Sequence, residues 1–147
     1  MIDKTINVGK IMTTNVITLH PEDTMDKVKV IFDTNSIHHI PIVEDNKVVG
    51  IISKTDYLKL LHSFTLFKTT KSDSYNAAIM RSLLVSEVMT KQVAKLNLTD
   101  SVETAVGFFR ENLFHALPVV TTEGNLVGII TTYDLLNFAF SEPMLLG

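Results

Sequence analysis

The sequence predicts an α+β (α/β) fold built as a tandem pair of β-α-β-β-α units, packed sheet to sheet with pseudo-two-fold symmetry. Three observations support this prediction. The chain repeats itself once, each copy alternates β-rich runs with helical patterns, and 46% of the 147 residues are hydrophobic. A copy of roughly 60 residues buries only a small fraction of its own surface, so we expect the sheets of the two copies to pack together.

The repeat becomes visible when the sequence is shifted by 77 positions, which aligns segment 11–43 with segment 88–120. One residue inserted around 121–125 then changes the shift, and segment 49–56 aligns with 127–134. Such a duplication is the first feature to establish, because it decides how the rest of the chain is interpreted. The sequence divides into a first copy, a connector with its own helix, a second copy and a C-terminal tail, at 8–62, 63–84, 85–141 and 142–147.

Each copy is predicted to begin with a short strand and a helix. In the first copy the strand is Val16–Leu19, and Asp23-Thr24 would cap the helix that follows. Asp100-Ser101 would cap the matching helix of the second copy. Apolar residues at helical spacing indicate the buried faces of these helices. These residues are Met25, Val28 and Phe32 in the first copy and Val102, Ala105 and Phe109 in the second.

A predicted β-hairpin and a second helix complete each copy. In the first copy, strands Ile40–Val43 and Val48–Ile52 flank the polar turn Glu44–Lys47. The corresponding turn of the second copy is Thr121–Asn125. Helical spacing of apolar residues resumes directly after each hairpin. Segment 77–84 of the connector is also helical in composition.

Composition excludes several classes of function. The chain contains no cysteine, which excludes disulfides, thiolate metal sites and cysteine nucleophiles. Its formal net charge of −3 argues against direct binding of nucleic acid. Its apolar runs are far shorter than the roughly 20 residues that cross a bilayer, and we find no signal peptide at its start. We therefore expect a cytoplasmic protein that does not contact the membrane.

Three short motifs occur in both copies and in the same order. They are Ile11-Met12-Thr13 with Val88-Met89-Thr90, His38–Val43 with His115–Val120, and Gly50–Asp56 with Gly128–Asp134. Together they resemble the paired CBS domains, also called a Bateman module, over nearly the whole chain. The resemblance implies a stand-alone sensor that binds AMP, ADP, ATP or S-adenosylmethionine in the cleft between the two units. It implies neither a covalent cofactor nor a metal, and it implies a homodimer that signals to an unknown effector protein.

The last motif also has chemistry of its own. Ser53 and Thr131 each end a strand, and an acid, Asp56 or Asp134, follows three residues later at the start of a helix. Free N–H groups and a hydroxyl at a helix N-terminus suit a phosphate, and a carboxylate can accept both hydrogens of a ribose diol. The same spacing also fits a capping box, in which these residues bond only to each other. Capping is favoured by spacing alone, and ligand contact is favoured once the resemblance is included.

The resemblance implies two composite sites, each joining elements of both copies. In each site apolar residues would flank adenine, while hydroxyl and carboxylate groups would hold ribose and phosphate. The first would use Ile17, Ile37, His38, His39, Thr131, Tyr133 and Asp134, with His115 nearby for phosphate. The second would use Ala94, Phe114, His115, Ser53, Lys54, Thr55 and Asp56. We expect the first site to bind more tightly, because it has the additional His39.

The histidines permit other interpretations. In an extended strand His38 and His39 point to opposite faces, which argues against a shared metal ion. By the resemblance, His39 stands where a phosphate-binding base is frequent, and it would carry charge only in part near neutral pH. Ala116 replaces it in the second copy. Each histidine is otherwise explained as a polar residue at a strand edge.

Three functions compete at this stage. A ligand-binding regulator is favoured, and an enzyme is not expected because no catalytic motif is present. The alternative to the regulator is a non-catalytic dimerisation or assembly module whose ligand sites are degenerate. Such a module would use its apolar helices and the apolar C-terminal residues Phe138, Phe140, Met144, Leu145 and Leu146.

Overall fold

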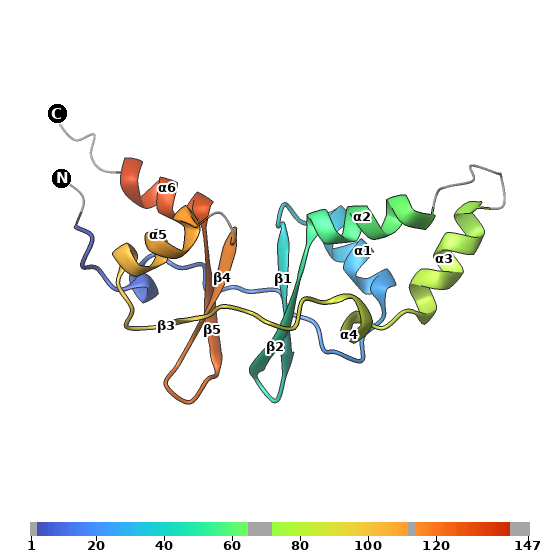
Figure 1. Ribbon diagram of the computed structural model, residues 1–147, viewed down its shortest axis with the longest axis horizontal. Helices are drawn as coiled ribbons and strands as arrows, with labels where there is room; N and C mark the ends of the chain where they lie inside the picture. Colours follow the sequence, from blue (N-terminus) through green and yellow to red (C-terminus); the bar gives the residue numbers. More distant parts are fainter. Residues whose placement is uncertain (1–2, 65–71, 112–113, 142–147) are drawn as a thin grey trace. The chain divides into compact units, whose positions relative to one another are not determined.

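The computed structural model of the chain describes residues 3–64, 72–111 and 114–141 (Figure 1). It contains helices and two separate sheets, which confirms the predicted α+β class. The residues group into two compact units, and each unit draws on both sequence copies. Unit 1 comprises Met1–Val16, Asn46–Val48 and Val93–Gly147, and unit 2 comprises Ile17–Asp45 and Val49–Gln92. A unit is therefore not the same stretch of chain as a copy.

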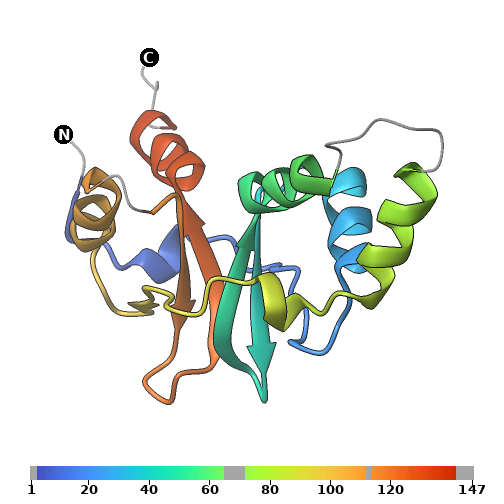
Figure 2. The ribbon, with the colours of Figure 1, turned by 45° about the vertical axis from the view of Figure 1, so that its right-hand side comes forward.

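Unit 2 is organised around a hairpin of two strands, β1 and β2, of which residues Asn46–Val48 group with unit 1. The predicted turn is confirmed: Asp45 and Asn46 join the strands with φ angles of 51° and 65°, the left-handed values that a tight hairpin turn requires. Helices α1, α2 and α3 lie together on the right of Figure 2, and α3 is the helix predicted in the connector. The elements are α1 (Met25–Thr34), β1 (His39–Glu44), β2 (Lys47–Ser53), α2 (Lys54–Phe64), α3 (Ser72–Ser82) and α4 (Val85–Val88).

Unit 1 contains a three-stranded sheet in the order β3-β4-β5. Strand β3 is parallel to β4, and β4 is antiparallel to β5 with an irregular register between Val119 and Val120. Helix α6 continues directly from β5 and contacts α5. The elements are a 3-10 turn, η1 (Val8–Lys10), followed by β3 (Leu96–Asn97), α5 (Val102–Arg110), β4 (Ala116–Val120), β5 (Leu126–Thr131) and α6 (Thr132–Phe140). The predicted tail 142–147, with Met144, Leu145 and Leu146, lies outside the described residues.

The strand predicted at Val16–Leu19 is wrong in extent. Only Leu19 pairs there, through a single parallel bridge to Ile42. In the second copy the aligned segment is 93–96, of which only Leu96 lies in β3, and the N–H of Leu98 continues the pairing by donating to the Val120 carbonyl (2.9 Å). Pro21 occupies the position of Leu98 in the first copy and has no N–H to donate. The first copy therefore cannot extend the same ladder.

The Met-Thr motif at the start of each copy packs against the strand before a helix of the other copy. Thr13 exchanges two backbone hydrogen bonds with Ile129 of β5 (2.9 Å each), and Thr90 exchanges two with Ile51 of β2 (3.0 Å each). Next to each pair a methionine side chain lies on a glycine. A Cβ atom on Gly128 would overlap the Met12 sulfur and lie 2.8 Å from its Cγ, and Gly50 is equally close to Met89.

Each unit has its own hydrophobic core. In unit 2, the buried face of α1 packs on the hairpin and on α2, as predicted for Met25, Val28 and Phe32. In unit 1, Val102 and Ala105 of α5 are buried, and Phe109 packs partly buried against the core. Core residues of unit 2 are Leu19, Met25, Val28, Phe32, Ile40, Ile42, Ile52, Tyr57, Met80 and Val85, and those of unit 1 are Val8, Leu96, Ala105, Leu117, Val119 and Ile130.

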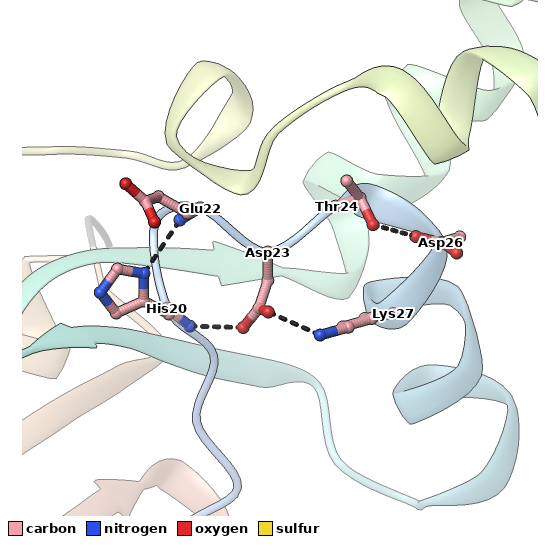
Figure 3. Close-up of polar contacts among 6 residues, drawn as sticks. All are labelled: His20, Glu22, Asp23, Thr24, Asp26 and Lys27. Atoms are coloured by element: carbon pink, nitrogen blue, oxygen red, sulfur yellow. Dashed lines mark hydrogen bonds and ion pairs between the residues drawn. The ribbon is translucent and has the colours of Figure 1, made fainter.

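The predicted helix caps are confirmed in one copy only. Ser101 caps α5, because its hydroxyl accepts a hydrogen bond from the Thr104 N–H (3.2 Å). Thr24 begins α1 without a side-chain cap, since its hydroxyl donates to the Asp26 carboxylate and the Lys27 N–H bonds to the Thr24 carbonyl. Figure 3 shows this region.

Asp23 stabilises the turn before α1 and not the helix terminus itself. Its carboxylate accepts one hydrogen bond from the His20 N–H and another from the Lys27 ammonium, each at 2.7 Å (Figure 3). Asp100 of the second copy accepts the equivalent bond from the Asn97 N–H, also at 2.7 Å. The Lys27 ammonium, and after it the His20 N–H, hold the pKa of the Asp23 carboxyl below its ordinary value.

We expect Asp23→Asn to flatten the acid dependence of stability. A lowered folded-state pKa contributes stability above the ordinary carboxyl pKa, and that contribution is lost as the pH falls through the folded-state value. Wild type should therefore lose more stability than the variant between about pH 5 and pH 2, by up to about 1 kcal/mol. Urea unfolding at several pH values measures this difference. Asp33→Asn, which removes an exposed pair with Lys29, is the control, and equal pH slopes for wild type and Asp23→Asn would contradict the expectation.

We also expect the same substitution to have opposite effects at two glycines. Gly128→Ala should lower the free energy of unfolding by about 1–3 kcal/mol, because its Cβ would displace Met12. Gly107 lies inside α5 with open space around it, so Gly107→Ala should raise that energy by about 0.5–1 kcal/mol. Urea unfolding of both variants tests the packing. A Gly128→Ala protein as stable as Gly107→Ala would show that Met12 is not held on this strand.

Candidate functional site

In unit 1, the start of α6 forms a complete capping box. The Thr131 hydroxyl accepts from the Asp134 N–H (3.2 Å), and Asp134 Oδ2 accepts from the Thr131 N–H (2.8 Å) and from its hydroxyl (3.1 Å). The other carboxylate oxygen, Oδ1, accepts from the Thr13 hydroxyl (3.0 Å). The capping interpretation of this motif is therefore confirmed here.

In unit 2, the start of α2 is arranged differently. The Ser53 hydroxyl accepts from the Asp56 N–H (3.0 Å), so the serine also bonds to the helix N-terminus. Among the residues that the structure describes, however, no hydrogen bond or ion pair reaches the Asp56 carboxylate. Thr90, which aligns with Thr13, pairs with Ile51 through its main chain. Asp56 is thus a half-buried acid at a helix start whose acceptor positions are open.

Unit 2 also contains four residues predicted for the first site, Ile17, Ile37, His38 and His39. His38 is exposed and His39 half-buried, and the His38 carbonyl accepts from the Lys54 N–H (2.7 Å). This bond brings the segment before Pro41 to the start of α2. His38 and Lys54 were assigned to different predicted sites. Within unit 2 they are joined by this main-chain hydrogen bond.

The remaining predicted residues of unit 2 differ in burial. Ile37 is half-buried and packs against the hydrophobic core, whereas Ile17 is half-buried outside that cluster. Thr55 is exposed. Tyr57, which follows Asp56, is buried against Phe32, with ring centroids 5.6 Å apart. Burial, together with the nearby Asp33, raises the pKa of Tyr57, so its hydroxyl stays protonated at neutral pH.

In unit 1, two of the apolar residues predicted to flank adenine belong to the protein's own packing. Phe114 meets Phe108 edge to face, with centroids 5.9 Å apart, and Ala94 also packs against the core. His115 is exposed, as is Tyr133, with 69% of its surface accessible. His115 and Tyr133 are therefore accessible to a ligand, whereas Thr131 and Asp134 are half-buried, as are Ala94 and Phe114.

Thr13 is the residue that the sequence analysis missed at these sites. It was recognised only as part of a repeated motif, and nothing in its spacing indicates a partner in α6. The signal that could have identified it is the alignment of Thr13 with Thr90, because a hydroxyl repeated at one position has a structural reason. Within the described residues there is also no group of three acidic or histidine side chains that could hold a metal, and no helix there is long and apolar enough to span a membrane.

Comparison with known proteins identifies the duplicated unit. A family model described as CBS domain matches residues 8–63 and 85–141. The structure is similar to that of protein MJ1225 from Methanocaldococcus jannaschii, with a TM-score of 0.79 and 28% identity over 94% of this chain and 49% of that chain. It is also similar to CBSX2 from Arabidopsis thaliana, with a TM-score of 0.76 and 25% identity over 92% of this chain and 94% of that one. CBSX2 has been solved in complex with AMP as well.

The curated relatives include longer proteins. Inosine-5'-monophosphate dehydrogenase from Thermoplasma acidophilum is 26% identical over 126 residues, which make up 86% of this chain and 22% of the dehydrogenase. The chain spans between 22% and 48% of the length of the first curated relatives it matches. The similarity to such an enzyme therefore covers only a part of it.

The two acids should contribute differently to stability without any ligand. Asp56 and Asp134 each lie in the first turn of a helix, so replacing either one removes the same favourable interaction with the helix dipole. Asp134→Ala also removes a capping box and the bond to Thr13, so it should lower the free energy of unfolding by about 1 kcal/mol more than Asp56→Ala does. Urea unfolding at neutral pH measures the difference, and equal losses would contradict the two bonding patterns.

Proposed function

The chain belongs to the CBS domain family, and on that premise we propose that it is a non-catalytic regulatory module that binds an adenosine nucleotide. The observation that carries the proposal is the Asp56 carboxylate, which stands at the start of α2 and accepts no hydrogen bond from the residues that the structure describes. The Asp56 oxygens are not among the buried side-chain atoms without a partner, so they are accessible from solvent. A ligand with two adjacent hydroxyl groups would donate to them.

A nucleotide suits the groups around this acid. The carboxylate would accept both hydroxyl hydrogens of a ribose, while the positive dipole end of α2 would attract a phosphate. The N–H groups of Lys54 and Asp56 are already bonded to the His38 carbonyl and the Ser53 hydroxyl. Lys54, the first residue of α2, adds a cation at the same terminus. The reported complex of CBSX2 with AMP makes AMP the first ligand to test.

Asp134 has less acceptor capacity for the same ligand, because the capping box and Thr13 already use it. We therefore propose that the helix start at Asp56 binds more tightly than the one at Asp134, the reverse of the order expected from His39. The other predicted contacts stay part of the proposal. They are Ile17, Ile37, His38, His39, Ala94, Phe114, His115, Ser53, Thr55, Thr131 and Tyr133.

We further propose that ligand binding changes the conformation of the chain, and that a partner protein responds to the change. Such regulation requires a ligand with different affinities for the two conformations, since equal affinity shifts no population. We propose a cytoplasmic homodimer as the form that acts. S-adenosylmethionine is an alternative ligand, because it carries the same ribose diol.

One observation favours an assembly module as the second candidate. Tyr133, Leu136 and Phe140 follow one another at helical spacing along α6, with 69%, 57% and 75% of their surfaces exposed. An exposed apolar stripe of this kind is typical of a surface that contacts another protein. Tyr133 belongs to this stripe and is also among the proposed ligand contacts. Absence of ligand binding would reject the regulator and leave the assembly module.

We expect AMP to bind the wild-type protein in isothermal titration calorimetry. Asp56→Ala should weaken binding by about 10-fold or more, since hydrogen bonds to a charged group are among the stronger ones. Wild type should also prefer AMP to 2′-deoxyadenosine monophosphate, and Asp56→Ala should lose that preference, because the acid is proposed to read the diol. Asp33→Ala, an exposed acid of α1, should leave both affinities unchanged.

A thermal-shift panel of AMP, ATP, S-adenosylmethionine and NAD complements the titration. At about 100 times its dissociation constant, a ligand adds roughly 2.7 kcal/mol to stability. No shift with any of them, together with no heat of AMP binding, would reject the sensor and leave the assembly module. Equal AMP affinity in wild type, Asp56→Ala and Asp134→Ala would reject both acids as contacts.

A further inference from the structure

Thr13 occupies part of the candidate site in unit 1. Its main chain is held by two hydrogen bonds to Ile129 of β5, which fixes the residue beside the start of α6. From there its hydroxyl donates to Oδ1 of Asp134 (3.0 Å). The residue is thus anchored by its backbone while its side chain reaches the carboxylate.

The acceptor capacity of Asp134 is nearly used by the protein itself. A carboxylate offers about four lone-pair positions, and a ribose diol needs two of them. The Thr131 N–H, the Thr131 hydroxyl and the Thr13 hydroxyl each donate to this carboxylate. A diol can therefore bind fully only if one of these donors leaves. The Thr131 bonds hold the helix cap, so the Thr13 hydroxyl is the donor whose loss disturbs the fold least.

We propose that Thr13 is an affinity-determining residue, whose hydroxyl competes with the ribose of a nucleotide for Asp134. The inference rests on the proposed function, and it deepens that function by explaining how two nearly identical motifs acquire different affinities. The competition is intramolecular, so it acts at every ligand concentration and lowers the apparent affinity by a constant factor.

Unit 2 provides the contrast. Thr90 makes the same pair of backbone hydrogen bonds, to Ile51 of β2. Within the described part of the chain its hydroxyl makes no hydrogen bond to Asp56. Thr13 therefore competes at the start of α6, whereas Thr90 does not compete at the start of α2. The Asp56 site should fill first as nucleotide is added.

The test uses the full chain with Asp56→Ala, which leaves Asp134 as the remaining acid, and measures AMP affinity by calorimetry. Adding Thr13→Val removes the hydroxyl at nearly constant volume. Binding should tighten by about 3- to 10-fold, the factor that corresponds to the net free energy of one hydrogen bond. Adding Thr13→Ser should keep the weaker affinity, because serine retains the hydroxyl. Adding Thr90→Val is the matched control and should change nothing.

Each other outcome overturns the inference. Unchanged or weaker binding with Thr13→Val would mean that the hydroxyl does not compete, or that it positions Asp134 for the ligand. No binding in the Asp56→Ala background, with or without Thr13→Val, would also overturn it, while AMP binding by wild type in the same experiment would leave the proposed function intact. Failure of wild type to bind AMP would instead remove the proposed function. Circular dichroism of each variant, and Thr13→Ala as a second deletion of the hydroxyl, exclude misfolding as the cause.

Discussion

The close packing of a methionine on a glycine, twice in the chain, is the constraint on which the rest of the structure depends. Met12 lies on Gly128 and Met89 lies on Gly50, and next to each contact a threonine exchanges two backbone hydrogen bonds with the strand. Any side chain on these glycines would occupy the space of the methionine. Because each methionine comes from the other sequence copy, both copies are needed to complete each unit. Each unit of the fold is therefore built from both copies of the repeat.

This packing also determines what surrounds the two acids. The strands that receive Thr13 and Thr90 lead directly into the helices that begin with the Ser/Thr-x-x-Asp motifs. The backbone hydrogen bonds of Thr13 and Thr90 to these strands therefore place a threonine beside each helix start. In unit 1 the threonine hydroxyl reaches the carboxylate, and in unit 2 the described residues leave the carboxylate open. A small difference in side-chain geometry separates a structural acid from one that suits a ligand.

Aspartate can either stabilise the fold or bind a ligand, because an ionised carboxylate only accepts hydrogen bonds. Whether it stabilises the fold or binds a ligand depends on which donors lie within reach. Asp23 and Asp100 illustrate the first role, since each accepts the N–H of a residue three positions earlier and fixes a turn. Asp134 is used in a similar way, through its capping box. Asp56 differs from all three, which is why it supports a binding function best.

The sequence alone determined the duplication, the α+β class, both hairpin turns and the buried faces of α1 and α5, because these depend on local spacing and turn chemistry. The predicted first strand is too long, because the pairing partner of each residue is set by a distant strand: only Leu19 pairs there, with Ile42. The sequence also could not decide between capping and ligand contact for Asp56 and Asp134. Identical spacing allows both, and only the tertiary structure brings Thr13, more than a hundred residues away in the chain, to one carboxylate. The physical reason is that hydrogen-bond donors from distant segments carry no signal in the local sequence.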